Sequence, residues 1–469
     1  MSVTVFRVVQ RRSVRPVALA AALLAAPIGA QAETLESALA RAYGGNPTIG
    51  AQRALVRATD ENVPRALSGY RPSVAATGSV GINYLTGENA VAAGANGRFR
   101  GSLVPRTLGL QVSQNVFNGF RTANSTRQAE SQVLGARESL RNTEQTILFN
   151  GAQAYMNVLR DTAILDLQRN NVEVLEEQLR QTRDRFNVGE VTRTDVAQSE
   201  SRLAAARSQV SVAESNLQTS IATFRQIVGV EPRQLAPGRP VDRLVPPSIS
   251  AAVQIGLEEH PAIISALHAV DAAELQVKAA EGELAPTVNI VGSVGQSYQS
   301  SFVADQAFSA QVLGQISVPI YQGGEVYARV RQNKETAGQR RIEAEATRDQ
   351  VRAAVVSAWG SLESAKANVQ AAQAQVAAAE VALTGVREEA RVGQRTTLDV
   401  LNQQQELLNA RVNLITAQRD RVVASFAVVQ AIGRLSAKSL GLNVALYSAK
   451  LHYDQVRDLP WGLTTPDGR

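Results

Sequence analysis

The sequence predicts an α + β membrane protein in which very long helices adjoin amphipathic β-strands. Three observations support this fold class: an internal duplication, strands of membrane length with one apolar face, and two long stretches without proline. The composition agrees, because the 469 residues are 44% apolar but only 4% aromatic, which is poor in the bulky residues of a compact core. An ordinary globular domain is therefore not expected.

The duplication is visible in two short stretches. NVGEVTRTDV at residues 187–196 returns as RVGQRTTLDV at residues 391–400, with Val, Gly, Thr, Asp and Val in the same positions. Pro47 pairs with Pro261 at a spacing ten residues wider than that of the two stretches, so the first half carries an insertion. GENAVAAGANGRFRG, at residues 87–101, has the composition of an exposed loop and is the expected place for it.

Period-two alternation on either side of this loop predicts a β-hairpin with one apolar face in each half. The alternating segments run from Val74 to Tyr84, Leu108 to Val116, Val288 to Tyr298 and Phe308 to Val318. We expect each strand to exceed the roughly 9 to 11 residues that cross a bilayer with tilt. Aromatic residues cluster at the strand ends, as in the girdles of a membrane barrel: Tyr70, Tyr84, Phe99, Phe117, Phe120, Tyr298, Phe302, Phe308 and Tyr321. Four strands cannot close a barrel, so two, three or four copies would have to supply eight, twelve or sixteen.

Both halves are expected to continue into very long helices. No proline interrupts the chain between Pro105 and Pro232, or between Pro319 and Pro460. A helix over residues 121–187 would be ~100 Å long at about 1.5 Å per residue. In the second helix of this hairpin, which runs back from the tip and is called the return arm, apolar residues recur every seven positions. This heptad spacing predicts coiled-coil packing. The spaced residues are Val196, Leu203, Val210, Leu217 and Phe224.

The two repeated stretches are the expected tips of helical hairpins. Gly189 and Gly393 stand where the first helix must end, in the left-handed conformation that favours glycine. Asp195 and Asp399 stand where the next helix begins, and capping is the simplest role for them.

The N-terminus predicts export from the cytoplasm. Residues 1–32 have the pattern of a signal peptide, with four arginines, an apolar run from Val17 to Ile28, and Ala30-Gln31-Ala32 at the cleavage site. Those arginines supply four of the six net positive charges, so nucleic acid is not an expected partner. The chain has no cysteine, which excludes disulfides and thiolate metal sites. A helical membrane span is not expected either, so any crossing would be as a closed β-barrel.

These residues together resemble the TolC family of outer-membrane channel proteins, over essentially the whole mature chain. The resemblance rests on YRP and LAP leading into the hairpins, FNGF and YQGG leaving them, and the doubled VGxxxxxDV tips. HYDQVRDLPWG, at residues 452–462, is similar to the C-terminal pattern of the branch that serves type I protein secretion.

The resemblance implies a homotrimer in which twelve strands form one outer-membrane barrel and the helices continue it as a periplasmic tunnel. It implies a passive exit duct without a cofactor, for type I protein secretion, multidrug efflux or both. The tips would dock a periplasmic adaptor, which links the tunnel to an inner-membrane ABC transporter or proton-driven pump. Outer-membrane lipid would surround the barrel.

The resemblance also assigns roles to the tip residues. Thr194 and Asp195 of the first tip would bond to Arg395 and a tyrosine of the second, holding the tunnel mouth closed, while Asp399 would line it. This chain departs from the pattern at two positions, with Ala390 in place of the tyrosine and Asn402 in place of a second lining aspartate. The expected adaptor-docking positions are Val188, Gly189, Val392 and Gly393.

A periplasmic adaptor, a diffusion porin and an enzyme are the alternatives. A periplasmic coiled-coil adaptor would share the long hairpins and the export signal, but not the four amphipathic strands. A diffusion porin would have no use for such long helices. The three histidines, His260, His268 and His452, form no catalytic or metal-binding motif, so an enzyme is not expected.

The domain organisation follows the duplication. A first repeat is predicted at residues 33–233, with strands about 73–117 and long helices about 121–228. A Pro-rich linker at 234–247 leads to a second repeat at 248–436, with strands about 287–320 and long helices about 323–433. An equatorial segment and tail, residues 437–469, would complete the chain.

Overall fold

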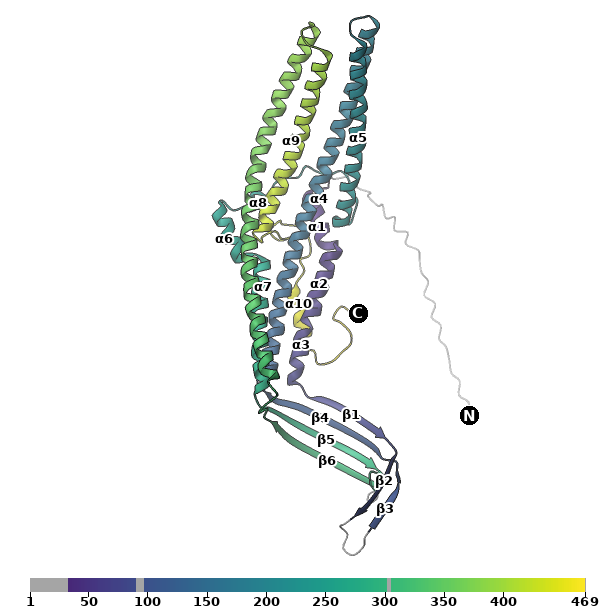
Figure 1. Cartoon of the computed structure of the whole chain (residues 1–469), viewed down its shortest axis with the longest axis vertical. Helices are drawn as coiled ribbons and strands as arrows, with labels where there is room; N and C mark the ends of the chain where they lie inside the picture. The colour runs from purple at the N-terminus through teal and green to yellow at the C-terminus, as the bar shows by residue number, and fades with distance from the viewer. Residues whose placement is uncertain (1–32, 90–96, 302–304, 469) are drawn as a thin grey trace, which may run out of the picture.

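The computed structural model describes residues 33–89, 97–301 and 305–468. The predicted signal peptide, residues 1–32, lies outside the described residues. The molecule is elongated, with two helical hairpins at one end and a β-sheet at the other (Figure 1).

Each half places short helices, then strands, then a long helix and its return arm. The first half contains α1 (Leu35–Gly45), α2 (Pro47–Asp60), α3 (Asn62–Leu67), β1 (Ser73–Val80), β2 (Asn83–Asn89), β3 (Gly97–Leu103), β4 (Arg106–Asn118), α4 (Arg121–Asn187) and α5 (Arg193–Val228). The second half contains α6 (Ile249–Glu259), α7 (Pro261–Glu281), β5 (Thr287–Tyr298), β6 (Gln306–Ser317), α8 (Glu325–Arg391) and α9 (Thr397–Ala431), followed by α10 (Ala449–Val456).

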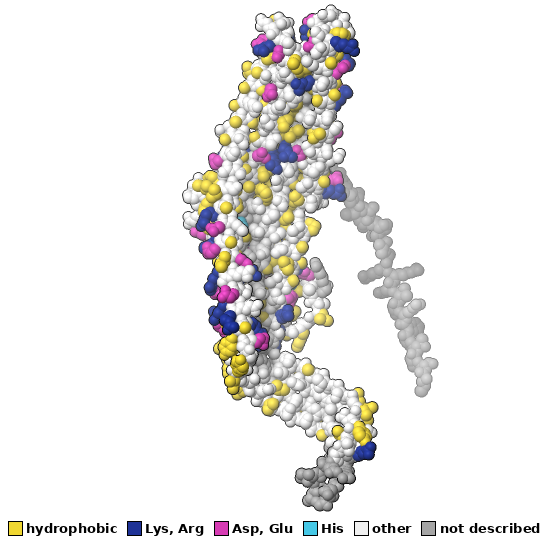
Figure 2. All heavy atoms as spheres, in the orientation of Figure 1, with side chains coloured by type: hydrophobic (Ala, Val, Ile, Leu, Met, Phe, Trp, Pro, Cys, Tyr) yellow, Lys and Arg dark blue, Asp and Glu magenta, His cyan; other side chains and the backbone are white. Residues whose placement is uncertain are grey.

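The main sheet is antiparallel, with strand order β1-β4-β5-β6. One face is apolar and uncovered within the chain; its exposed side chains include Val74, Val80, Leu108, Val294, Phe308, Val312 and Ile316. The other face is polar, with cross-strand hydrogen bonds between Ser79 and Thr107 (2.6 Å) and between Asn115 and Asn289 (2.9 Å). These four strands contain one charged residue, Arg106, at the start of β4. Charged side chains instead lie along the helices (Figure 2), and such a sheet is suited to lipid on its apolar face.

The predicted strand from Val74 to Tyr84 is wrong in its length. β1 ends at Val80, after 8 residues, whereas β4, β5 and β6 have 13, 12 and 12. The ladder breaks opposite Pro105, which has no N–H to donate, and the Gly81 N–H instead donates to the Pro105 carbonyl at 3.0 Å.

The predicted loop at residues 87–101 is also largely wrong. β2 and β3 pair in register from Asn83 with Leu103 to Asn89 with Gly97, so most of the insertion is a second hairpin. Residues 90–96 lie outside the described part of the chain.

The predicted long helices are confirmed. α4 and α8 each have 67 residues, ~100 Å at about 1.5 Å per residue. Apolar residues line the seams between each long helix and its return arm, and those buried there include Leu165, Leu179, Leu203, Leu362, Leu383 and Leu408. None of the helices in the described ranges combines the length and hydrophobicity needed to cross a bilayer.

The largest core lies midway along the helices, where segments distant in sequence meet. Tyr155 of α4 is fully buried, and its hydroxyl lies 2.7 Å from the Glu33 carbonyl and 2.6 Å from the Ala236 carbonyl. Burial raises the pKa of Tyr155, so the hydroxyl stays protonated and able to donate. This contact ties the first described residue and the interrepeat segment to the long helix.

Candidate functional site at the helical tips

The two tips end their long helices in the same way. Gly189 has φ +77° and Gly393 has φ +79°, so the predicted left-handed helix ends are confirmed. In the first tip the Glu190 N–H donates to the Arg185 carbonyl at 2.9 Å, and Gln394 N–H donates equivalently to the Glu389 carbonyl at 2.9 Å. These bonds satisfy carbonyls that a helix end leaves without a partner.

The return helices also begin in the same way, by a capping box. The Thr192 hydroxyl accepts from the Asp195 N–H at 3.3 Å, and the Asp195 carboxylate accepts from the Thr192 N–H at 2.9 Å. Thr396 and Asp399 repeat this arrangement at 3.2 and 3.0 Å. The reciprocal pair satisfies two N–H groups at each helix start.

This geometry refines the expected capping role. The N-cap residues are Thr192 and Thr396, and the aspartates sit three positions later. The prediction missed these threonines, although the spacing Thr-x-x-Asp in TRTD and TTLD is the signal for them. The hydrogen bond from the Thr192 hydroxyl lowers the pKa of Asp195, and the Thr396 N–H lowers that of Asp399.

Each tip contains an ion pair that sequence reasoning did not find. In the first tip Arg185 Nη2 lies 2.7 Å from Glu190 Oε1, and in the second Arg395 Nε lies 2.8 Å from Glu389 Oε2. Arg395 is therefore engaged within its own tip. Within the described part of this single chain, Arg395 makes no hydrogen bond or ion pair with Thr194 or Asp195.

The two hairpins are joined just beyond the tips. The Arg202 side chain of α5 donates to the side-chain oxygen Oδ1 of Asn402 in α9 at 2.8 Å, and Leu401 packs among Leu175, Leu179 and Leu203. The position at which the family pattern has an acid thus holds a neutral amide, which accepts a hydrogen bond from an arginine of the other hairpin in this chain.

A groove of about 720 Å³ separates the end of α4 from the second tip. Ala390 lies on its wall, so the small side chain at the tyrosine position leaves this space open. Most of the charged residues of the groove differ by side, with Glu173, Glu177 and Glu190 on the first hairpin and Arg387, Arg391 and Arg395 on the second. Arg185 is an arginine on the first side, and it pairs with Glu190.

The predicted docking residues are on the surface of the tips. Val188 is 79% exposed and Val392 is 71% exposed, which is unusual for valine. Nothing lies within 4 Å of a Cβ placed on Gly189 or Gly393. Both tips therefore offer an uncovered Val-Gly pair.

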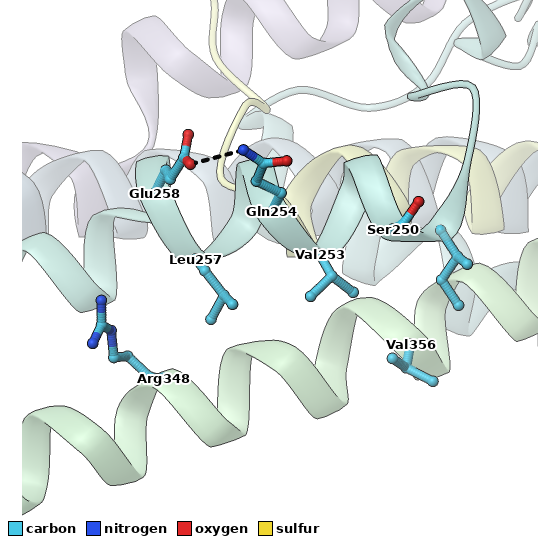
Figure 3. A pocket seen from close by; sticks show the side chains of 8 residues that line it. Ser250, Val253, Gln254, Leu257, Glu258, Arg348 and Val356 are labelled. Carbon is cyan, nitrogen blue, oxygen red and sulfur yellow. Dashed lines mark hydrogen bonds between the residues drawn. The ribbon is translucent and has the colours of Figure 1, made fainter.

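The rest of the molecule offers little for catalysis. A pocket of about 660 Å³ between α6 and α8 is lined mainly by apolar side chains such as Val253, Leu257 and Val356 (Figure 3). Its charged lining residues are Glu258 and Arg348, and Glu258 accepts a hydrogen bond from Gln254 at 3.1 Å. Across the ranges that the structure describes, no group of three or more His, Cys, Asp or Glu residues could hold a metal ion.

The histidines have structural surroundings. The His260 Nδ1 accepts from the Ala262 N–H at 3.2 Å at the start of α7, and burial lowers its pKa. His452 lies 3.0 Å from the buried carboxylate of Asp60, and His268 lies 3.6 Å from Asp271.

Comparison with known proteins identifies the family. The family model for outer membrane efflux proteins matches residues 37–230 and 252–434. The chain is 41% identical over 471 residues to the outer membrane efflux protein BepC of Brucella suis, covering 100% of both chains. It is 26% identical over 438 residues to the outer membrane protein TolC of Escherichia coli, covering 89% of this chain and 85% of that one.

A solved structure supports the same conclusion for the fold. The Campylobacter jejuni CmeC outer membrane channel superposes with a TM-score of 0.76 at 16% identity, covering 90% of this chain and 89% of that chain. Together with the family match along most of the sequence, this establishes that the chain belongs to the outer membrane efflux proteins, a family of outer-membrane export channels and not of enzymes.

Proposed function

We propose that three copies of the chain form one continuous duct, with a twelve-stranded barrel in the outer membrane and a helical tunnel in the periplasm. The observation that carries the proposal is the four-stranded sheet with its uncovered apolar face. Among the described strands, β1 and β6 each have one edge without a partner. Such edges must be paired or covered, and β6 pairing with β1 of the next copy removes both.

The helices would continue the barrel in the same order. α2, α4, α7 and α8 follow one another across the helical part, which extends from one end of the sheet. α2 lies on the side of β1 and α8 on the side of β6 (Figure 1). A second copy that pairs with β6 would therefore also meet α8. Each copy supplies two tips, so three copies place six tips around one mouth.

The tips are proposed as both the mouth and the adaptor-docking surface. Thr194, Asp195 and Arg395 would form contacts between neighbouring hairpins when the mouth is closed, and Asp399 would line the mouth. Docking would use Val188, Gly189, Val392 and Gly393, which are exposed in the chain. The duct has no motif for energy coupling, so an inner-membrane ABC transporter or proton-driven pump would drive export through the adaptor.

The proposed domain boundaries follow the duplication. The two repeats occupy residues 33–233 and 248–436, the linker occupies 234–247, and residues 437–469 form the equatorial segment and tail. The repeated order of helix, hairpin, long helix and return arm supports this division.

Crosslinking tests the docking role, because the chain has no cysteine of its own. A cysteine at Gly189 should capture an adaptor in living cells, to be identified by mass spectrometry. An adaptor that serves an ABC exporter would assign type I secretion, and one that serves a proton-driven pump would assign efflux. A Gly338→Cys variant, near the start of α8 and far from the tips, is the control. An intact trimer that captures no adaptor from Gly189 would contradict docking at the tips.

Conductance tests the gate. Arg395→Ala should raise the conductance of the trimer in planar bilayers, because it removes the only tip arginine assigned to the closing contacts. Arg185→Ala, which breaks the ion pair of the first tip, is the matched control and should have less effect. Unchanged conductance in Arg395→Ala would remove this arginine from the gate.

A further inference from the structure

The C-terminal tail (residues 458–468) exposes large apolar side chains in a short stretch. Trp461 is 85% exposed, Leu463 is fully exposed and Leu459 is about half exposed. A soluble surface seldom presents such residues together without a partner. Trp461 is also one of only two tryptophans in the whole chain.

The helix that precedes the tail is firmly seated. Val456 of α10 is fully buried, and His452 Nδ1 lies 3.0 Å from Asp60 Oδ2 on α2. Asp60 is itself fully buried, so this contact is a specific attachment of α10 to the end of α2.

The tail is then held at both ends. The Arg71 guanidinium donates to the carbonyl oxygens of Asp458 and Leu459, at 3.2 and 3.0 Å. At the far end Asp467 lies 3.6 Å from Arg57 of α2. Trp461 and Leu463 thus project from a loop whose two ends are fixed.

Arg71 also shows where this loop lies along the long axis of the molecule. It follows Tyr70 and precedes Ser73, where β1 begins. Trp461 is two residues from a carbonyl that Arg71 binds, so it lies within ~7 Å of chain from that point at about 3.5 Å per residue. In Figure 1 the tail loops beside α3, close to the start of β1.

Other apolar residues are exposed at this same junction of helices and strands. Tyr70, Phe120, Ile320 and Tyr321 are all more than half exposed. Aromatic residues at this level of a membrane protein occupy the interface between lipid and water. The tail therefore continues a surface that already faces the membrane boundary.

We propose that the C-terminal tail rests on the periplasmic surface of the outer membrane, with Trp461 and Leu463 inserted among the phospholipids of its inner leaflet. An indole ring suits this interface, since its apolar body enters the lipid while its N–H remains hydrogen-bonded. The loop is already ordered by Arg71 and Arg57, so binding would cost little further conformational entropy. This inference rests on the proposed function, in which the sheet lies in the outer membrane.

Fluorescence quenching tests this directly. The full-length trimer would be reconstituted in phospholipid vesicles whose acyl chains carry bromine near the headgroup. In a Trp359→Phe variant, where Trp461 is the remaining tryptophan, bromolipid should strongly reduce the emission. The reverse variant, Trp461→Phe, leaves Trp359, which is half-buried in α8 and 34 residues from its start, about 50 Å at 1.5 Å per residue. Its emission should be unaffected.

A third variant separates the proposal from its premise. Phe308→Trp, with both native tryptophans replaced by phenylalanine, places a probe on the apolar face of β6, and it should be quenched. If this strand probe is quenched and Trp461 is not, the tail does not touch lipid and the proposal is wrong. A blue-shifted Trp461 emission that bromolipid leaves unchanged would assign the tail to a neighbouring copy instead. If the strand probe also escapes quenching, the sheet itself is not in lipid and the proposal fails with it.

Discussion

The two tips have nearly the same backbone but opposite arrangements of charge. Their glycines differ by two degrees in φ, and both return helices begin with a Thr-Asp capping box. Yet Arg185, in the last turn of α4, occupies the position that Glu389 occupies in α8. Each pairs with an opposite charge in the following turn, Glu190 in one tip and Arg395 in the other.

The comparison shows that different groups fix the backbone of a tip and set the charge on its surface. The glycine and the capping box satisfy backbone groups that would otherwise lack partners, so they fix the turn. The ion pairs are about half exposed, where such pairs add little stability. The charged residues can therefore differ between the tips without changing the turn, so two tips of the same backbone conformation have different surface charges.

The largest effect is expected from the glycines. Gly189→Ala and Gly393→Ala force a side chain into a left-handed conformation, at a cost of about 1–2 kcal/mol. Hydrogen exchange at the altered tip should accelerate roughly 5- to 30-fold, and equally in the two variants. Gly385→Ala, on the exposed surface of α8, is the control and should slow exchange, because alanine favours helix by about 1 kcal/mol. A loss confined to one tip would show that the turns are not equivalent.

A smaller effect is expected from the caps. Thr192→Ala and Thr396→Ala each remove an N-cap hydroxyl, which typically costs about 1 kcal/mol. Exchange at the start of α5 or α9 should accelerate roughly fivefold. Thr192→Ser and Thr396→Ser keep the hydroxyl and should behave like the unsubstituted chain. If serine fails to preserve protection, the threonine methyl and not the cap would be the stabilising group.

The sequence predicts the backbone of the tips better than their side-chain contacts. The long helix from Arg121 to Asn187 is predictable because proline is absent and Gly189 ends it. The expected start of α5 at Asp195 is two residues too late, because the N-cap is Thr192 and the helix begins at Arg193. The ion pairs depend on side-chain positions at an exposed turn, and bonds between tips of different copies depend on an assembly that no single chain contains.

The sheet shows the same limit. Alternation locates β4, β5 and β6 because one face is apolar throughout. It does not show the break after Val80, which depends on Pro105 in the partner strand and therefore on the register of pairing. A proline opposite a strand acts through the ladder, which local sequence does not display.

Acid should loosen both tips in the same way. Hydrogen bonds from Thr192 and Thr396 lower the folded-state pKa values of Asp195 and Asp399 below the ordinary value of an aspartate side chain. The stability that each carboxylate contributes is therefore fully present above the unfolded pKa and is lost as pH falls through the folded pKa. After correction for intrinsic rates, exchange protection at the tips should hold from pH 7 to about 4 and fall below that. Asp399→Asn should abolish this dependence in the second tip alone, and a second tip that still titrates would assign the effect to another group.

The smallest effect on tip stability is expected from the ion pairs. Arg395→Ala and Arg185→Ala should change exchange at their tips by little, because water and salt already screen both pairs. Exchanging the pair in the second tip, as Glu389→Arg with Arg395→Glu, should likewise leave the turn intact while giving it the charge order of the first tip. Exchange that accelerates as much as in the glycine variants would show that charge helps to fix the backbone. If exchange protection at the tip is retained, the turn is unaltered. Any change in conductance or adaptor capture by these variants then comes from the altered surface charge.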